Sequence, residues 1–394
     1  MVETTPVTTV DGPAPPHDAV VQDAVSRRDL LRAGTALAAG VALSPLLGTT
    51  RAEARTPAAA GWYAPADTAR HTRTWMAWPA RRRVWGSWLE GAREDVARVA
   101  RAIAEHEPVA MVTRPHQASA AARACGASVD IVEIANDDCW MRDIGPVFLV
   151  DGKGGLAGLD LNFNGWGRRQ IHVEDRNVAR EVLATLGLQR FVAPFVAEGG
   201  ALEVDGHGTV MATESSIVNA DRNPGASKAR LTRDIRAHLG VREVLWVPGV
   251  RNRDITDDHI DALARFSRPG HVVVDQPADP DAHDVWAESE RRALRILRRA
   301  TDAHGRTLRC RISREPRRIP PGTHPRLFVR SYVNWYVCNG AVLIPSFTDR
   351  RADADTRALV RDLYPGRHVI QLRIDTIGDG GGGIHCITQQ QPAD

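Results

Sequence analysis

Short apolar runs alternate with amphipathic stretches along most of the chain, from Gly61 onward. Apolar residues at helical spacing predict helices over 94–106, 175–186, 230–239, 284–304 and 353–363. Apolar or alternating runs predict strands over 108–112, 131–134, 147–150, 159–163, 201–204, 209–213, 243–247, 271–274, 327–333, 341–344 and 369–374, with a further strand residue at Val337. Strands that are joined by tight turns and separated by helices are typical of an α/β or α+β fold.

No run of Pro, Gly or Ser longer than a few residues interrupts the chain between Gly61 and Pro392. Such runs commonly mark the boundary between two domains. We therefore expect residues 57–394 to form a single domain.

Residues 1–56 differ in character from the rest of the chain. Arg27 and Arg28 precede a weakly apolar run over 33–48, a pattern similar to a twin-arginine export signal. The run is shorter than the ~20 residues that span a bilayer, and it contains Pro45. We expect a disordered leader that directs export to the cell envelope or outside the cell, without stable membrane insertion. The alternative is a chance arginine pair beside an Ala-rich tail.

Composition adds little to this picture. The 394 residues are 43% hydrophobic and 25% charged, as in globular proteins with a sizeable core. The formal net charge is +3 and the arginines are scattered, so nucleic acid is not an expected partner. Five cysteines without a Cys-x-x-Cys pair exclude a disulfide framework and leave at least one thiol for chemistry. The oligomeric state is not evident.

The glycine-rich segment 378–383 is the most unusual part of the sequence, and Cys386 follows it closely. Dense glycine disfavours helix and strand, so it predicts a loop with positive φ or a close approach to a ligand or another segment. Cys386 is therefore a candidate nucleophile, with Ile384 and Ile387 anchoring the segment in a core. His385 is expected to point away from Cys386 if the segment is extended. The alternative is a flexible tail with an incidental cysteine.

A nucleophilic thiol needs a proton-transfer partner, which is commonly a histidine oriented by an acid. His259 and Asp261 are two residues apart, so an extended stretch would place both side chains on one face. Glu198 follows an apolar strand and precedes two glycines, a position where a strand end opens into a site.

The same His–Asp pair could instead bind a metal ion together with Asp257, Asp258 or His207. Zinc sites usually add Cys or His ligands at compact spacing, and that pattern is absent around His259. We therefore expect no metal.

A third candidate string covers residues 136–146 and carries Asp143 where a loop meets a strand. A planar guanidinium is held well by carboxylates that each accept two parallel N–H bonds, with an aromatic face to stack on it. Asp143 and Asp261 could form that pair, and Trp140 could supply the face. The alternative is a structural ion pair between Arg142 and Asp143.

Several strings, taken together and in order, resemble the agmatine deiminase family, a neighbour of the bacterial-type peptidylarginine deiminases. The strings cover residues 74–79, 140–146, 162–167, 198–200, 219–224, 259–261 and 380–392. The resemblance extends over essentially all of the chain from residue 62 to residue 392.

This resemblance implies the guanidine-modifying, or pentein, fold: a five-bladed α/β propeller with pseudo-fivefold symmetry and an active site on its axis. It implies neither a metal nor an organic cofactor. It assigns Cys386 as the nucleophile, His259 as the general acid and base, and Glu198 as the partner that orients the histidine. Asp143 and Asp261 become the guanidinium clamp.

Three further residues, Trp140, Asn334 and Gly383, are expected to shape the substrate pocket. One position departs from the family pattern, because Asp258 stands where a glycine usually precedes the catalytic histidine. This acid is expected to raise the pKa of His259 or to move its loop.

The resemblance implies a small guanidino substrate, agmatine, hydrolysed to N-carbamoylputrescine and ammonia through a covalent cysteine intermediate. One alternative is an exported deiminase of peptidyl-arginine or free arginine, and the carboxylate of free arginine would need a donor such as Arg253. Another is a protein that binds guanidino compounds or polyamines without turnover.

Overall fold

A β–β–α–β unit repeats along the residues that this computed structural model describes, 56–323 and 328–393. In each of the five described sheets an antiparallel strand pair is followed by a helix and then by a strand parallel to its neighbour. A parallel partner needs such a crossover connection, because a tight turn can join only antiparallel strands.

The first sheet contains β16 (Thr388–Pro392), β1 (His71–Ala77), β2 (Val109–Thr113) and β3 (Val129–Glu133). The other four sheets, in chain order, contain β4 (Val147–Val150), β5 (Leu156–Asp160) and β6 (Gln189–Val192); β7 (Glu203–Val204), β8 (Thr209–Thr213) and β9 (Glu243–Val247); β10 (Ala264–Arg268), β11 (His271–Gln276) and β12 (Arg309–Arg314); and β13 (Tyr336–Cys338), β14 (Ala341–Pro345) and β15 (His368–Leu372).

The longer helices are α2 (Leu89–Ala104), α3 (Ala118–Cys125), α6 (Asp175–Thr185), α8 (Lys228–Leu239), α10 (Val285–Leu297) and α11 (Arg350–Leu363). The short helices are α1 (Arg82–Trp85), α4 (Met141–Ile144), α5 (Gly165–Arg168), α7 (Glu214–Ile217), α9 (Ile260–Leu263) and α12 (Asp375–Asp379), with 3-10 turns η1 (Ala58–Ala60), η2 (Gly86–Trp88), η3 (Pro115–Gln117) and η4 (Gly199–Ala201).

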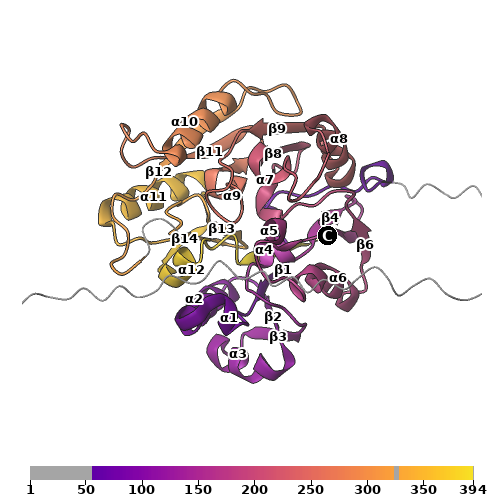
Figure 1. The fold of residues 1–394 in the computed structure, drawn as a ribbon, viewed down its shortest axis with the longest axis vertical. Coiled ribbons are helices and arrows are strands. Elements are labelled where there is room, and N and C mark those ends of the chain that lie inside the picture. Colours follow the sequence, from indigo (N-terminus) through magenta and orange to yellow (C-terminus); the bar gives the residue numbers. More distant parts are fainter. Residues whose placement is uncertain (1–55, 324–327, 394) are drawn as a thin grey trace, which may run out of the picture. The chain divides into compact units, whose positions relative to one another are not determined.

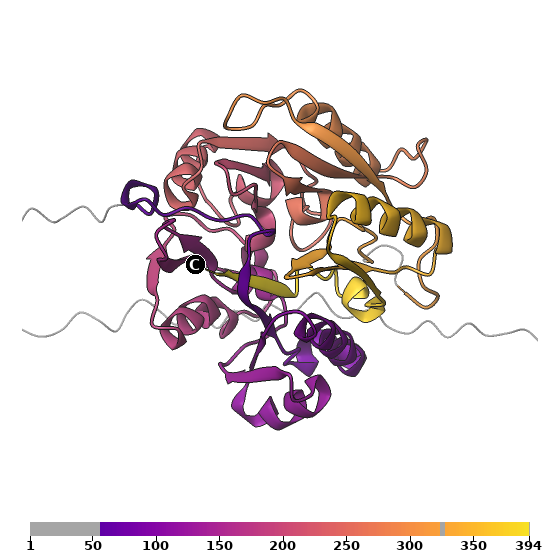
Figure 2. The same cartoon turned by 180° about the vertical axis from the view of Figure 1, so that it is seen from behind.

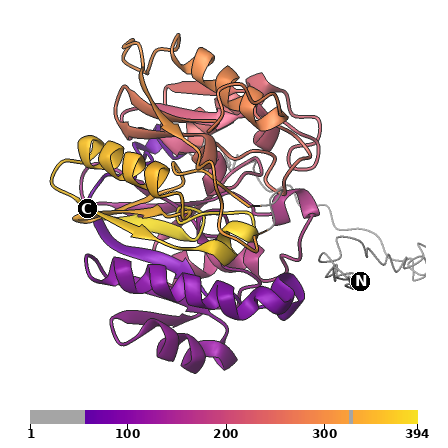
Figure 3. The ribbon, with the colours of Figure 1, turned by 90° about the vertical axis from the view of Figure 1, so that its left-hand side faces the viewer.

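The sheets surround a common centre that holds α4, α5, α7 and α9, and α8, α10 and α11 lie towards the outside (Figures 1 and 2). The described residues therefore form a five-bladed α/β propeller, which confirms the predicted fold. Helices α2 and α3 of the first blade pack against each other (Figure 3).

Packing explains the sequence pattern of each blade. The strands β8 and β14 are buried along their whole length, so their residues form continuous apolar runs rather than an alternation. Helix α2 buries only one stripe, which includes Val96, Val99 and Ile103 at helical spacing.

The last strand closes the ring by pairing with the first. Strand β16 is antiparallel to β1, and Trp75 is opposite Gln389. The indole N–H of Trp75 also donates to Gln391 Oε1 at 2.9 Å. The end of the described chain is thereby fixed to its beginning.

Several predicted elements need correction. The predicted helix 284–304 is α10, which ends at Leu297. Residues 302–306 form a turn instead, in which the carboxylate of Asp302 accepts from the backbone N–H groups of His304 and Arg306. The predicted strand 159–163 is β5, which starts earlier and ends at Asp160.

Three other strand predictions also differ from the structure. Only Glu203 and Val204 of the predicted strand 201–204 are in a strand, because a 3-10 turn precedes them. Residues 328–333 are not a strand, since Phe328 and Tyr332 pack with Phe347 in a separate cluster. The predicted strand 369–374 is β15, and β16 follows it.

The predicted leader lies outside the described residues except for its last position, residue 56. Among the described helices, none combines the length and the apolar character needed to cross a bilayer.

Candidate active site

Each described sheet is preceded, before the first strand of its antiparallel pair, by a short turn or helix that carries predicted site residues. They are Asp143 in α4 before β4, Glu198 before η4 and β7, His259 and Asp261 at the start of α9 before β10, Asn334 before β13, and Cys386 in the turn before β16. The short helices α4 and α9 lie near the common centre (Figure 1), and close side-chain contacts join the Glu198 and Cys386 segments to α9.

The predicted catalytic side chains lie within hydrogen-bonding or ion-pairing distance of one another. His259 Nε2 is 3.2 Å from Glu198 Oε2, and its Nδ1 is 3.8 Å from Asp143 Oδ2. The Sγ of Cys386 is 3.6 Å from Asp261 Oδ2. Cys386 is half-buried and the others are buried. The structure thus joins in one cluster the residues that the sequence placed in separate strings.

Asn334 anchors the turn that carries the thiol. Its Oδ1 lies 3.4 Å from Cys386 Sγ and accepts from the backbone N–H of His385 at 3.1 Å. Asn334 is buried, and its Nδ2 has no hydrogen-bond partner among the described residues. The expected pocket residue is therefore a direct neighbour of the thiol.

Arg222 positions Glu198, a contact that the sequence did not reveal. Its Nε donates to both carboxylate oxygens of Glu198, at 2.8 and 3.0 Å, and one of its terminal nitrogens donates to Asp257 Oδ2 at 2.9 Å. Burial alone would raise the pKa of Glu198, but Arg222 and His259 outweigh it and the pKa lies below its ordinary value. Glu198 therefore stays anionic beside the histidine.

Trp166 and a glycine backbone hold Asp143. The Trp166 indole N–H donates to Oδ2 at 2.9 Å, and the Gly200 N–H donates to Oδ1 at 3.0 Å. A Cβ atom at Gly200 would lie 2.7 Å from His259 Nδ1, so only glycine fits there. Both residues belong to strings used for the family resemblance, although the sequence did not indicate their contacts.

The acids of the cluster control the protonation of the histidine and the thiol. Burial lowers the pKa of His259, but Asp143, Glu198 and Asp261 outweigh it and raise the pKa to about 9. Burial, and then the charges of Asp261 and Asp143, raise the pKa of Cys386 well above its ordinary value. At neutral pH the unliganded site therefore holds an imidazolium and a neutral thiol.

The two carboxylates of the predicted clamp are not equivalent. Burial and the charges of Glu198 and Asp261 raise the pKa of Asp143 to about 6, although His259 lowers it. Burial would also raise the pKa of Asp261, but His385 and His259 bring it below the ordinary value. The Oδ1 of Asp261 is buried and has no hydrogen-bond partner among the described residues. This arrangement suits a cationic group that can donate to a carboxylate.

The glycine-rich loop owes its composition mainly to close approach. A Cβ atom at Gly382 would lie 2.2 Å from Trp140 Cζ3, and one at Gly383 would lie 2.3 Å from Asn334 Oδ1. Trp140 stacks on Trp85 with ring centroids 5.9 Å apart. The loop is therefore pressed between an indole face and the residue that anchors the thiol turn.

The local geometry predicted for two of the strings was wrong. His259 and Asp261 are not in an extended stretch, because His259 is the N-cap of α9 and Asp261 lies within that helix. His385 does not point away from the site, because residues 384–387 form a turn. The His385 Nδ1 lies 2.8 Å from Asp261 Oδ2, the oxygen that Cys386 also contacts.

Asp258 stands where the family pattern has glycine, and its backbone conformation is one that suits glycine. Asp258 has φ 67°, in the left-handed region that glycine adopts most readily and Asp tolerates. Its Oδ2 accepts from the Ser289 hydroxyl at 2.9 Å. Burial, and then the charge of Asp254, raise the pKa of Asp258 to about 7. Asp258 thus keeps the conformation that the loop requires, and its carboxylate is held by a hydrogen bond from Ser289 of α10.

Two residues that were considered as metal ligands have other environments. Asp257 pairs with Arg222, and His207 is exposed. Arg142 lies 4.0 Å from Asp67 Oδ1, and no ion pair between Arg142 and Asp143 is found among the described residues. Arg253 is exposed.

A five-bladed α/β propeller with a cysteine, a histidine and paired carboxylates at its centre defines the class of guanidine-modifying enzymes. Within that class, the chain belongs to the Porphyromonas-type peptidyl-arginine deiminase family, whose model matches residues 63–392.

Known relatives agree with this assignment. The chain is 37% identical to an agmatine deiminase of Pseudomonas aeruginosa over 364 residues, which cover 86% of this chain and 97% of that protein. It is 36% identical to an agmatine deiminase of Ectopseudomonas mendocina with the same coverage. The solved structure of an agmatine deiminase of Enterococcus faecalis matches with a TM-score of 0.80 and 29% identity, over 86% of this chain and 98% of that one.

We expect the substitution Gly383→Ala to displace Asn334 and the thiol turn, because the added methyl group would overlap the Asn334 carboxamide. A displacement of about 1 Å in a catalytic group costs roughly 100-fold in rate, so kcat should fall by about that factor. Gly61→Ala is the control for backbone strain without a steric overlap, because Gly61 has a positive φ that disfavours alanine but open space around its Cβ position. Equal activities of the two variants in a steady-state assay would contradict the expectation.

Proposed function

We propose that this protein hydrolyses the guanidinium group of agmatine to N-carbamoylputrescine and ammonia, through a covalent intermediate on Cys386. The observation that carries the proposal is the contact of the Cys386 sulfur with the buried Asp261 carboxylate, with Asp143 and His259 in the same cluster. Family membership and relatives named agmatine deiminase support the reaction and the substrate.

Substrate binding would activate the thiol by charge compensation. In the free site the charges of Asp261 and Asp143 oppose ionisation of Cys386. A guanidinium held by those two carboxylates offsets both charges and places a cation beside the sulfur, so the thiol pKa falls. The thiol proton then leaves to solvent, and the thiolate faces the guanidinium carbon.

The reaction would proceed by addition and elimination at that carbon. The thiolate forms an S–C bond, His259 donates its proton to one nitrogen, and the C–N bond breaks to release ammonia. The resulting thiouronium remains bound to Cys386. Neutral His259 then removes a proton from water, and the hydroxide adds to the carbon. The C–S bond breaks as the hydroxyl proton passes to the departing sulfur, which regenerates the thiol and releases the ureido product.

Glu198 and Arg222 would keep this proton transfer aligned. Glu198 holds the Nε2 edge of His259, and Arg222 fixes both oxygens of Glu198. The Nδ1 edge of the ring is then the one near Asp143 and the bound guanidinium. An acid that orients a histidine without exchanging its own proton is a common catalytic arrangement.

A second candidate substrate is peptidyl-arginine or free arginine. The description of the family model favours it, since that description names peptidyl-arginine. These substrates carry the same guanidinium, so the clamp alone does not discriminate among them. The distinction must come from groups that contact the other end of the substrate.

The substrate can be tested by incubating the purified protein with agmatine, free arginine and an arginine-containing peptide, and by measuring ammonia and ureido product. We expect agmatine to give the largest kcat/KM, by at least about 100-fold, as is typical when unpaired polar groups of the competitor must be buried. Turnover of the peptide but not of agmatine would replace the proposed substrate by the second candidate.

The nucleophile can be tested with Cys386→Ala, which should abolish turnover. Cys310→Ala is the matched control, since Cys310 is a half-buried cysteine in β12, away from the cluster. Retained turnover in Cys386→Ala would refute the covalent mechanism.

The raised pKa values predict an unusual pH profile. Because the free enzyme must lose the Cys386 proton, kcat/KM should rise about tenfold per pH unit through neutral pH. The rise should stop near pH 9, where His259 loses the proton that it donates, and should be steeper below about pH 6, where Asp143 is neutral. Steady-state rates between pH 5 and 10 check this, and a profile that falls above about pH 6.5 would contradict it.

We further propose that residues 1–56 carry a twin-arginine export signal, on the basis of Arg27 and Arg28 before a short apolar run. Replacing both by lysine should retain the protein in the cytoplasmic fraction of the producing cell. Unchanged fractionation of this variant would contradict export by this route.

A further inference from the structure

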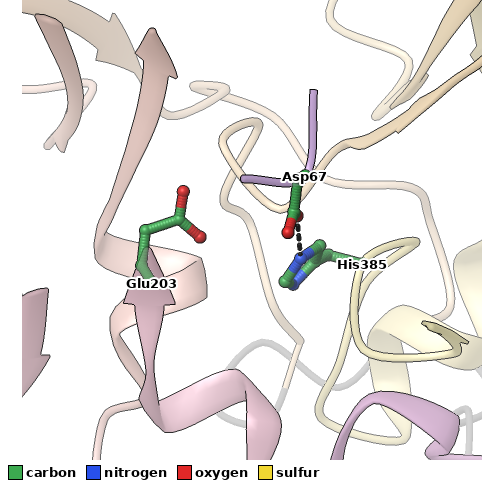
Figure 4. Close-up of side chains that lie close together, drawn as sticks. All are labelled: Asp67, Glu203 and His385. Carbon is green, nitrogen blue, oxygen red and sulfur yellow. Dashed lines mark hydrogen bonds and ion pairs between the residues drawn. The ribbon is translucent and has the colours of Figure 1, made fainter. Parts of the chain in front are cut away.

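A series of buried contacts leads from Asp261 through His385 to Asp67. His385 lies between two acids, with Nδ1 2.8 Å from Asp261 Oδ2 and Nε2 2.8 Å from Asp67 Oδ2. The ring is 1% exposed. Figure 4 shows the imidazole directed at the Asp67 carboxylate, with Glu203 facing the same space. His385 takes no part in the proton transfers of the proposed reaction.

Asp67, Glu203 and His385 are close enough to share a metal ion, with one ligand atom of each lying within 4.8 Å of the others. However, the guanidinium of Arg265 already occupies this position. Its Nε donates to Glu203 Oε2 and its terminal nitrogen to Asp67 Oδ2, both at 2.6 Å. Arg265 is 1% exposed and keeps its charge. The group is therefore an ion-pair network rather than an empty cation site.

This network fixes Asp67 as an anion. Burial would raise the pKa of Asp67, but Arg142 and Arg265 outweigh it and hold the pKa well below its ordinary value. Gln390 also donates to Asp67 Oδ1, at 2.6 Å. The far end of the His385 ring thus meets a rigid, charged partner.

The Nδ1 side of the His385 ring contacts one oxygen of the Asp261 carboxylate and leaves the other without a partner. His385 Nδ1 contacts Oδ2, whereas Oδ1 has no hydrogen-bond partner among the described residues. A free carboxylate could rotate about its last side-chain bond and change the plane in which its two oxygens lie. Burial, and then the charges of Arg142 and Arg265, lower the pKa of His385, so the neutral ring carries one N–H. With that proton on Nδ1, the ring donates to Asp261 Oδ2 and prevents the rotation.

We propose that His385 is a positioning residue for the reaction: its Nδ1 contact fixes the plane of the Asp261 carboxylate so that Oδ1 is presented to the guanidinium of the substrate. The role rests on the proposed function, since it needs a guanidinium bound by Asp261. His385 itself touches neither the substrate nor the reacting atoms. It acts through Asp261, and the Asp67–Arg265 network keeps its ring in place.

Two substitutions separate the two ends of the ring. In His385→Asn the side-chain amide nitrogen can replace Nδ1 and still donate to Asp261. In His385→Gln it can replace Nε2 and donate only to Asp67. We expect the Asn variant to bind a guanidinium within about 3-fold of the parent, and the Gln variant to bind about 10- to 100-fold more weakly, the usual effect of losing a hydrogen bond to a charged group.

Binding should be measured by calorimetry with ethylguanidinium in a Cys386→Ser background, which removes turnover from the readout. His116→Gln is the control for a histidine substitution at an exposed position. Equal weakening in both His385 variants, or weakening only in the Asn variant, would overturn the proposal, because ring packing or the Asp67 contact would then carry the effect. Parent-like binding in both variants would overturn it as well.

A second measurement needs no substitution of His385 and therefore does not depend on the folding of the variants. In the 15N-histidine-labelled Cys386→Ser protein, the Nδ1–H proton of His385 should give a hydrogen-bonded signal that shifts when ethylguanidinium binds Asp261. An unchanged signal at saturation would overturn the proposal. Saturable binding of ethylguanidinium without agmatine turnover by the unsubstituted enzyme would count against the proposed function alone, and no binding by the parent would count against both.

Discussion

An excess of buried negative charge at the propeller centre determines the chemistry of this site. Asp143, Glu198 and Asp261 are buried there, and Arg222 and His259 provide the compensating cations. Burying an acid without a counter-charge is costly, so the site is most stable when a further cation enters it. The charges of Asp261 and Asp143 also oppose ionisation of the Cys386 thiol. In the proposed reaction, binding of the substrate cation and activation of the thiol would therefore be one electrostatic event.

The blade architecture explains how so many polar groups reach one point. Every site-bearing segment is a turn or short helix just ahead of the first strand of an antiparallel pair, so the groups occupy equivalent places in successive blades. The sequence predicted most of the longer strands and helices from their periodicity. It did not reveal the equivalence, because the segments share no motif: α4 and α9 are four-residue helices, whereas Cys386 is in a turn.

The sequence placed Asp143, Glu198, His259, Asp261 and Cys386 in unusual polar or glycine-rich strings that together resemble a known family, and these five side chains meet at the centre. It could not identify the contacts between strings. Arg222 with Glu198, Trp166 with Asp143 and His385 with Asp261 are separated by 24, 23 and 124 positions, and only the fold brings them together. The positive φ of Asp258 is likewise a property of the loop that no spacing indicates.

The pairing of β16 with β1 has a consequence for how the enzyme matures. His71 is opposite Pro392, so closing the ring joins positions more than 300 residues apart in the chain. The loop-closure entropy for that length is about 5 kcal/mol, and contacts of such high order usually form late in folding. The segment with Cys386 immediately precedes β16, so we expect it to settle beside Asp261 as the ring closes. Folding intermediates with an open ring should then lack the catalytic activity of the closed molecule.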